Sequence, residues 1–373
     1  MHIRRKIIIL LIFAFLFTGA GCQVDKTVKI GFSANLSGRN SILGVTARNG
    51  LEIAVEEINK AGGINGKKVE LIIKDDEADP RIAAKVDKEL LNSGVSAIIG
   101  HMLSSTVTAS LDIINSSNIL MLSPTISTES LTAQDDNIIR LIASNKHQGE
   151  RLAEFAISKH GIRNFAALHE YNNKAYSEEL YMYFREAVAE NDGQVLYANS
   201  FASGKNPNLA VLAEDISKLD VEGVLVVAGG MDTAILYQHL QKLKPGIKIY
   251  CGVWSMTEDL ITNGTNNMEN LYVVGTYDKE SSRMEFEHFR KRYIEVYNTE
   301  PTFASVHCYE ALYVLKESME EAEASNSQDI KSSLLKIRKF RGLMQDFEID
   351  QYGDAVRPYF IFTVANNDFK RVD

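Results

Sequence analysis

Residues 54–68 have the sequence AVEEINKAGGINGKK. Their first half continues an apolar pattern of helical period, which predicts a helix from about residue 45 to 61. Gly62 and Gly63 then end the helix, because glycine is the usual residue beyond a helix C-terminus. The run VELIIK at 69–74 follows at once and has the composition of a strand. The stretch therefore predicts a helix, a tight turn and a strand, which is one repeat of an α/β sheet.

The same alternation continues along the rest of the chain. Strands are predicted at 28–33, 97–100, 119–123, 165–169, 195–197, 223–228, 248–251 and 271–275. Helices are predicted at 82–93, 105–115, 176–190, 209–219, 233–243, 284–297 and 304–323. The C-terminal runs 347–354 and 359–364 are predicted to form a hairpin that turns at Gly353. Strand–helix alternation is typical of doubly wound parallel sheets, and the chain is too long for one simple core. We therefore expect two such lobes.

The N-terminus has the pattern of a secretory signal. Arg4-Arg5-Lys6 precedes the apolar run Ile7–Phe17, which is too short to span a bilayer as a helix. Small residues then lead to Cys22, a layout that resembles the lipobox of bacterial lipoproteins although Gly19 replaces its usual Leu. We expect residues 1–21 to be removed as a signal peptide and the chain to be exported and anchored to the membrane by a lipid on Cys22. An uncleaved signal anchor is the alternative.

Composition narrows the function classes. The chain is 45% hydrophobic and 24% charged, as in ordinary globular proteins, and its formal net charge is −9. No block rich in Lys and Arg with interleaved aromatics is present, so nucleic acid is not an expected partner. The two other cysteines, Cys251 and Cys308, fit no zinc spacing. Two buried thiols are expected, with a disulfide between them as the alternative in an oxidising compartment.

Enzymatic signatures are absent from the sequence. The histidines form no pair with metal-ligand spacing, and no Gly-x-Ser-x-Gly nucleophile motif occurs. Asp75 and Asp76 suggest either a metal pair or, as we expect, residues that cap the strand and help to start the following helix. His101 and His169 stand at strand ends, where structural or cleft-lining roles are expected. We predict a protein that is not an enzyme and has no metal or cofactor.

Hydroxyl side chains gather where two predicted strands end. Ser104, Ser105 and Thr106 follow strand 97–100 and begin a helix, and a second cluster occupies 123–128. Ligands of open α/β sheets bind at the carboxyl ends of strands, and a helix N-terminus attracts carboxylates. A plain helix cap is the alternative for the first cluster. Two such clusters on neighbouring strands favour a carboxylate pocket.

Several motifs together carry a resemblance to a known family. They are Leu36-Ser37-Gly38, Gly44, 54–68, Asp75–Pro80, Gly100-His101, Ser104-Ser105, Ser123-Pro124, Tyr176, Gly193, Gly229-Gly230, Asn298–Pro301 and Gly353-Asp354. In these motifs the chain resembles type I periplasmic binding proteins, and within them the leucine/isoleucine/valine-binding group. The resemblance runs from Val28 to the C-terminus. It implies two doubly wound lobes joined by short hinge crossovers, with lobe 1 at 27–143 plus 278–346 and lobe 2 at 144–277 plus 347–373.

The resemblance also assigns roles to individual residues. It implies that Ser105, beside Ser104, binds the carboxylate of an amino acid. Ser127 matches a threonine that contacts the ligand, with Ile126 beside it where the family commonly has Ala. Tyr176 matches an aromatic residue that the second lobe brings over the ligand. In the same way, Leu43 falls where an aromatic residue often lines the mouth of the cleft.

The position of the family's ammonium-binding acid is occupied differently here. That acid is expected near residues 252–255, where this chain has Trp254 and no carboxylate. Asp232 could supply the negative charge instead, or Glu258 or Asp259 could. This departure leaves open whether the ligand is a free α-amino acid.

The resemblance implies a binding function. The chain is expected to be a monomeric solute-binding lipoprotein of an ABC importer, which closes its hinge on an amino acid or a related carboxylate or amide. A permease in the membrane would then be its protein partner. A ligand-sensing module that reports to a separate signalling partner is the alternative within the same fold.

Overall fold

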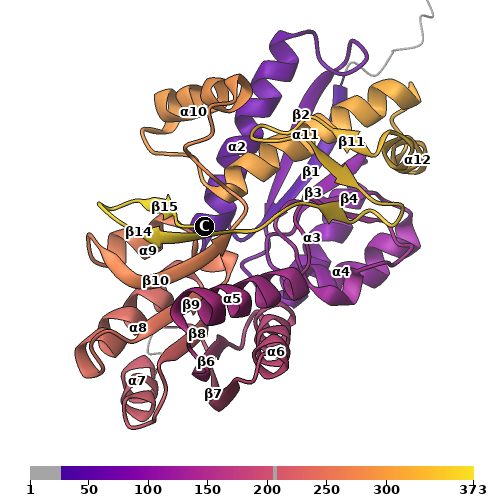
Figure 1. Ribbon diagram of the computed structural model, residues 1–373. Coiled ribbons are helices and arrows are strands. Elements are labelled where there is room, and N and C mark those ends of the chain that lie inside the picture. The colour runs from indigo at the N-terminus through magenta and orange to yellow at the C-terminus, as the bar shows by residue number, and fades with distance from the viewer. Residues whose placement is uncertain (1–26, 205–207) are drawn as a thin grey trace, which may run out of the picture.

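The computed structural model describes residues 27–204 and 208–373, which form two lobes around two large sheets (Figure 1). The sheet of the first lobe has the order β2-β1-β3-β4-β5, and all its neighbouring strands are parallel. Its strands are β1 (Thr27–Ala34), β2 (Lys68–Asp75), β3 (Ala97–Gly100), β4 (Met121–Ser123) and β5 (Ile138–Arg140). Because β1 lies between β2 and β3, this sheet is doubly wound, as predicted.

The sheet of the second lobe is mixed. Its order is β15-β14-β10-β9-β8-β6-β7, and the strands from β7 to β10 are parallel. The last two strands run antiparallel to their neighbours. The strands are β6 (Asn164–Glu170), β7 (Gln194–Phe201), β8 (Gly223–Val227), β9 (Lys248–Cys251), β10 (Met268–Gly275), β14 (Phe360–Val364) and β15 (Phe369–Arg371).

Helices cover the sheets. They are α2 (Ile42–Lys60), α3 (Pro80–Asn92), α4 (Ser104–Ser117), α5 (Asn145–His160), α6 (Lys174–Glu190), α7 (Leu209–Ser217), α8 (Gly230–Leu243), α9 (Glu258–Asn263), α10 (Met284–Tyr297), α11 (Phe303–Ala322) and α12 (Ser327–Ile337), with short 3-10 turns η1 (Glu129–Leu131) and η2 (Val253–Ser255). In the first lobe α11 packs against α2. A Cβ on Gly50 would lie 2.1 Å from the carbonyl oxygen of Ser305. The close approach of these two helices therefore requires glycine at position 50.

The predicted C-terminal hairpin is confirmed at its first strand and at its turn near Gly353, but the prediction of its second strand at 359–364 is wrong. β12 (Phe347–Ile349) pairs with β11 (Lys339–Phe340) and β13 (Ala355–Val356) in a small separate sheet. The turn at Gly353 lies against the first lobe, where the Arg140 backbone N–H donates to the Gly353 carbonyl over 2.9 Å. β14 instead pairs with β10, because that strand has a free edge. We propose that the first lobe extends past residue 346 to include β13, while the lobe boundaries otherwise stay as predicted.

β5 and α5 are two elements that the sequence analysis did not predict. β5 has only three residues, and the first turn of α5 buries the polar side chains of Asn145 and Gln148, so the apolar pattern of this helix begins only at Leu152. These two elements carry the first crossover between the lobes. The other crossovers follow β10 and β13, and all three are short, as expected (Figure 1).

Two further predictions concern the chain's location and its cysteines. In the part of the chain that the structure describes, no helix is long and apolar enough to cross a membrane. The predicted signal peptide and Cys22 lie outside the described residues. Cys251 and Cys308 are both buried and free, which confirms the prediction of two buried thiols. Burial raises the pKa of each thiol, so both stay protonated.

Candidate ligand-binding site between the two lobes

A narrow cavity lies between the lobes at the carboxyl ends of the central strands. Four of the residues predicted for the site line it, namely Leu43, Ser104, Tyr176 and Trp254. Thr125, from the predicted hydroxyl cluster at 123–128, also lines it, and the sequence analysis did not assign the other lining residues, Met102, Leu103, Asn173, Val253 and Phe303. The cavity volume is about 10 Å³, which is room for one water molecule at most. In this arrangement the lobes are closed, and a solute reaches the site only when they separate.

The helix N-terminus predicted to bind a carboxylate contacts the second lobe. α4 begins at Ser104, and the backbone N–H of Ser105 donates to Asn173 Oδ1 across the cleft over 3.1 Å. The Ser105 hydroxyl accepts from the backbone N–H of Ala175 over 3.3 Å. The side-chain oxygen of Asn173 therefore lies where a carboxylate oxygen would be held by this helix end.

Tyr176 and Trp254 form the aromatic wall that the second lobe contributes. Both are at most 5% exposed, and their rings meet edge to face with centroids 6.1 Å apart. The Tyr176 hydroxyl donates to Gln148 Oε1 over 3.0 Å. A Cβ on Gly252 would lie 2.2 Å from that hydroxyl, so only glycine fits there. Burial raises the pKa of Tyr176 well above its ordinary value, and the phenol is therefore neutral.

Ser127 and Ile126 lie beside the cleft without lining its cavity. The Ser127 hydroxyl donates to Asn145 Oδ1 over 2.6 Å and accepts from Gln148 Nε2 over 3.1 Å. Both partners belong to the first turn of α5, just after the first crossover. Ile126 is fully buried in an apolar cluster of the first lobe. In the closed arrangement these residues hold the hinge side of the cleft together.

The acid proposed for a ligand amine already has a basic partner. Asp232 is fully buried at the start of α8, and its Oδ1 accepts from Arg39 Nη2 over 2.6 Å and from Nε over 3.1 Å. Ser203 Oγ donates to Asp232 Oδ2 over 2.5 Å. Arg39 follows β1 in the first lobe, so this ion pair joins the two lobes. A polar cavity of about 210 Å³ adjoins it and also reaches Trp254 and Asn173.

The two alternative acids lie elsewhere. Glu258 is exposed at the start of α9 and lines a different cavity, together with Tyr277 and Glu300. Asp259 is partly buried, and burial, followed by the charge of Glu258, raises the pKa of its carboxyl. Neither lines the cavity between Tyr176 and Ser104.

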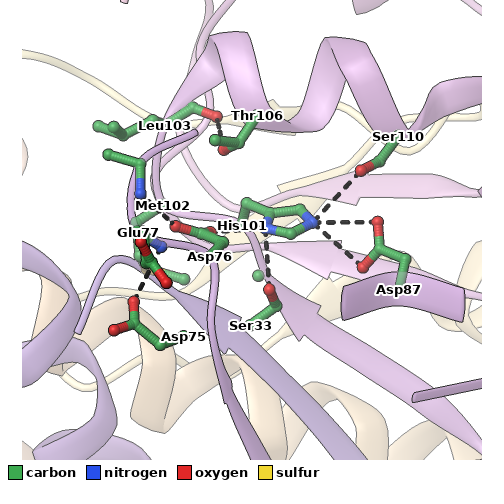
Figure 2. A network of polar contacts seen from close by, with 12 residues as sticks. Ser33, Asp75, Asp76, Glu77, Asp87, His101, Met102, Leu103, Thr106 and Ser110 are labelled. Atoms are coloured by element: carbon green, nitrogen blue, oxygen red, sulfur yellow. Dashed lines mark hydrogen bonds and ion pairs between the residues drawn. The ribbon is translucent and has the colours of Figure 1, made fainter. Parts of the chain in front are cut away.

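His101 begins the loop that leads to Ser104 and Ser105, and its buried ring holds this loop on the sheet edge (Figure 2). Its Nδ1 is 2.7 Å from Asp76 Oδ2, and its Nε2 is 3.1 Å from both oxygens of Asp87. All three side chains are at most 1% exposed. Burial alone would lower the pKa of His101, but the two carboxylates outweigh it and raise that pKa to about 10. The ring is therefore an imidazolium ion, and both its N–H groups donate.

One half of the expectation for Asp75 and Asp76 is confirmed, since Asp75 Oδ1 and Asp76 Oδ1 accept from the backbone N–H groups of Glu77 and Ala78, each over 2.9 Å, and so cap the end of β2; the other half, the helix start, is wrong. α3 starts at Pro80 and is capped by Asp79, whose carboxylate accepts from the Arg81 backbone N–H over 2.8 Å. Asp75 instead accepts from the Leu36 backbone N–H, and Asp76 pairs with His101 (Figure 2). Within 27–204 and 208–373 no group of three His, Cys, Asp or Glu side chains could hold a metal ion. Both aspartates therefore organise the loops at the sheet edge.

Two of the lining residues that the sequence analysis missed lie, like Ser104, just after the carboxyl end of a strand. Asn173 and Val253 follow β6 and β9, at the carboxyl ends of strands of the second sheet. Phe303 begins α11 in the first lobe. A sequence search for polar and aromatic residues after every strand, and not only after those with hydroxyl clusters, could have found Asn173, whereas Val253 carries no such signal.

The chain is similar to known binding proteins in both sequence and fold. A family model described as periplasmic binding protein matches residues 27–369. The leucine-, isoleucine-, valine-, threonine- and alanine-binding protein of Pseudomonas aeruginosa is 30% identical over 205 residues, which are 55% of this chain and 53% of that protein. The match therefore spans about half the length of this curated relative.

Two solved structures share the fold over almost the whole chain. The branched-chain amino acid transporter substrate binding protein LivJ from Streptococcus pneumoniae, in complex with isoleucine, has a TM-score of 0.85 at 22% identity and covers 93% of this chain and 99% of its own. A solute binding protein of an ABC transporter from R. palustris, in complex with benzoate, has a TM-score of 0.84 at 17% identity, covering 93% and 95%. Both are binding proteins with two lobes of this architecture.

Proposed function

Because the chain belongs to the periplasmic binding protein family, a family of exported binding proteins and not of enzymes, we propose that it is the solute-binding component of an ABC importer. Its ligand would be an amino acid or a related small carboxylate or amide. The observation that carries this proposal is the N-terminus of α4, where the Ser105 N–H and hydroxyl meet Asn173 and Ala175 of the other lobe across the cleft.

In the proposed mechanism the Ser105 N–H exchanges its partner in the second lobe for a ligand carboxylate. When the lobes separate, the Ser105 N–H loses Asn173 Oδ1 and is free to donate to a ligand carboxylate. Closure then brings Tyr176 and Trp254 over the ligand and removes water. Hydrogen bonds to a charged carboxylate strengthen as the surrounding dielectric falls. A permease in the membrane would recognise the closed form.

The other end of the ligand depends on Arg39. A free α-amino acid needs a negative partner for its ammonium group, and Asp232 can serve only after exchanging the Arg39 guanidinium for it. A carboxylate without an amine needs no such exchange and would place its apolar part against Trp254 and Phe303. The relatives named above include both kinds, one with isoleucine and one with benzoate. Both classes are therefore included in the test.

The test is a thermal-shift screen of amino acids and small carboxylates, followed by calorimetry with the best ligand. A ligand at 100 times its dissociation constant should add about 2.7 kcal/mol of stability. Ser105→Ala should weaken binding by about 1 to 3 kcal/mol, because a buried carboxylate oxygen loses its donor. Ser116→Ala, at the exposed end of the same helix, is the control and should bind as the wild type does. Unchanged affinity of Ser105→Ala would remove this residue from the site.

We further propose that the protein is lipid-anchored at Cys22 after removal of residues 1–21. The signal pattern and the small residues before Cys22 support this. Cys22→Ser should release the protein from the membrane fraction into the soluble one, and mass spectrometry of the N-terminal peptide should find the lipid only in the wild type. A Cys22→Ser protein that stays in the membrane fraction contradicts the anchor.

A further inference from the structure

The wall of the narrow cavity between the lobes is uncharged. Of the described residues that line it, six are apolar and none is acidic or basic. The apolar ones are Leu43, Met102, Leu103, Val253, Trp254 and Phe303. An ammonium group enclosed here would lose its water without gaining a carboxylate, which strongly opposes binding. A carboxylate is better placed, because the N–H groups at the start of α4 attract negative charge.

The adjoining polar cavity of about 210 Å³ offers other surroundings to the far end of a ligand. The two cavities share the lining residues Leu103, Asn173 and Trp254, so one small molecule can extend from the first into the second. Glu77 and Glu170 line the polar cavity, and Asp232 lies behind its wall. Whether an ammonium group can be held depends on the partners of these acids.

Glu170 and Glu77 are poor partners for a bound ammonium group. Glu170 is fully buried, and its carboxylate accepts the backbone N–H groups of Asn172, Asn173 and Ser203 over 2.9 to 3.1 Å. Its negative charge therefore already holds two loops of the second lobe. Glu77 is exposed, and water screens its charge.

Asp232 is fully buried, and both its carboxylate oxygens are occupied. Oδ1 accepts from two nitrogens of Arg39, and Oδ2 accepts from the Ser203 hydroxyl. The guanidinium belongs to the first lobe and the carboxylate to the second, so separation of the lobes breaks this pair. The Arg39 side chain is 25% exposed and lines the polar cavity. A ligand in that cavity therefore meets the guanidinium in front of the acid.

We propose that Arg39 determines the specificity of the cleft, because it occupies Asp232 in the closed protein and so selects a small apolar carboxylate without an ammonium group. The ligand carboxylate binds at the start of α4, and the hydrocarbon part lies against Trp254 and Phe303. This inference rests on the proposed binding of a carboxylate in the cleft, and it narrows the ligand to one class. Removing the guanidinium frees the Asp232 carboxylate and should admit an amino acid.

Calorimetry of the mature chain with matched pairs of ligands tests this specificity. Each pair joins an amino acid to the carboxylate of the same carbon skeleton without the amine: leucine with 4-methylpentanoate, phenylalanine with 3-phenylpropanoate, and alanine with propanoate. Wild type should bind the amine-free member at least about tenfold more tightly, since the ammonium group finds no free carboxylate. In Arg39→Ala this ratio of dissociation constants should fall at least about tenfold, because the ammonium group can pair with Asp232.

Two further variants assign the change to the freed acid. Arg39→Ala combined with Asp232→Asn lacks the carboxylate and should regain the wild-type ratio. Arg81→Ala removes an ion pair of the same kind, between Arg81 and Asp79 within the first lobe, and should keep the wild-type ratio as the matched control. The ratio is compared because loss of the interlobe pair weakens closure on both ligands alike. Circular dichroism of each variant verifies that it is folded.

Three results would overturn the inference while leaving the carboxylate site intact. They are equal or tighter binding of the amino acid by wild type, a ratio that Arg39→Ala leaves unchanged, and a changed ratio that persists without the Asp232 carboxylate. If wild type and Arg39→Ala bind no member of any pair, the proposed carboxylate site itself is wrong, and this inference fails with it.

Discussion

His101 and His307 are both fully buried beside carboxylates, yet their pKa values are shifted in opposite directions. His101 lies under the ligand loop of the first lobe between Asp76 and Asp87, with the hydroxyls of Ser33 and Ser110 nearby. No arginine or lysine pairs with either aspartate in the described part of the chain. Two carboxylates around one ring keep the ring charged.

The buried group around His307, which we call the second centre, contains an arginine, whereas the group around His101, the first centre, does not. His307 Nδ1 is 3.0 Å from Glu310 Oε2, and Arg357 Nη2 is 2.8 Å from that same oxygen. Burial lowers the pKa of His307, and the nearby Arg357 charge adds to that effect. Burial would raise the pKa of Glu310, but Arg357 and His307 outweigh it and lower that pKa to about 2. The guanidinium thus neutralises the carboxylate, and the imidazole stays neutral.

The comparison shows that the partners, and not burial, decide the charge of a buried histidine. Desolvation is the same in kind at both sites and disfavours the charged ring. Each carboxylate without a basic partner favours the charged ring, and each guanidinium opposes it. Changing the partners should therefore convert one centre toward the other.

Removing the guanidinium should have the largest effect. Arg357→Met leaves Glu310 buried beside His307 alone, and we expect the free energy of unfolding to fall by about 3 to 5 kcal/mol. The pKa of His307 should rise, as at His101, because the carboxylate has lost its arginine. Denaturant unfolding and histidine NMR titration measure the two effects.

Two further variants control that experiment. Arg341→Met removes an exposed ion pair with Glu285 and should change stability by less than about 0.5 kcal/mol. Adding Glu310→Gln to Arg357→Met should restore part of the loss, since no buried charge is then unpaired. If Arg357→Met unfolds as easily as Arg341→Met does, the arginine does not determine the second centre.

Removing one carboxylate from the first centre should cost less. Asp87→Asn leaves His101 with Asp76, and we expect a loss of about 1 to 3 kcal/mol in stability together with a fall of the His101 pKa from about 10. NMR titration of the ring reports the pKa directly. Glu89→Gln, on the same helix, removes a half-buried ion pair with Lys74; it should leave the His101 pKa unchanged and lower the free energy of unfolding by less than about 1 kcal/mol. If the pKa of His101 is unchanged in Asp87→Asn, the Asp87 carboxylate is not needed to keep the ring charged.

The pH dependence should differ in sign between the two centres, and over a single pH unit it should be a smaller effect than the arginine substitution. The folded pKa of His101 is raised, so its stabilisation is complete below about pH 6.5 and is lost as the pH rises toward 10, by up to about 1.4 kcal/mol per pH unit. The folded pKa of Glu310 is lowered, so its stabilisation is present above about pH 4.5 and is lost toward pH 2.

Denaturant unfolding between about pH 7 and 8 measures the alkaline effect, because this window lies below the ordinary pKa values of cysteine and tyrosine. Wild type should lose stability across it, and Asp87→Asn should lose less per pH unit. Equal slopes in the two proteins would mean that His101 is not the group that titrates.

The two centres also show how far sequence reasoning reaches. His101 was recognisable at a strand end, but its partners lie 25 and 14 residues away, and Asp87 appeared only as a polar residue within a predicted helix. Arg357 is 50 residues from His307 and lies in a segment predicted as part of a hairpin. Nothing in the local pattern of either histidine distinguishes an imidazolium from an imidazole.

In the candidate site, too, some residues could be predicted from the local sequence and others could not. Ser104 and Ser105 were predictable, because a strand followed directly by a helix is a local pattern that puts the helix N-terminus at the sheet edge. Ser127 was assigned to the ligand through the family resemblance, yet its hydroxyl contacts Asn145 and Gln148 of a helix that was not predicted. The pairing of Asp232 with Arg39, which is 193 residues away in the chain, likewise could not be predicted from the sequence.

The sequence by itself was enough to predict the two lobes, the strand–helix alternation and the helix end that faces the cleft. Each of these features depends on residues that lie within a turn or a strand of one another. The charge of His101, the partner of Asp232 and the narrowness of the cleft came from the folded chain alone. Coulomb energies and desolvation depend on distances between groups that only folding brings together. Those distances are set by how the two lobes and their crossovers pack.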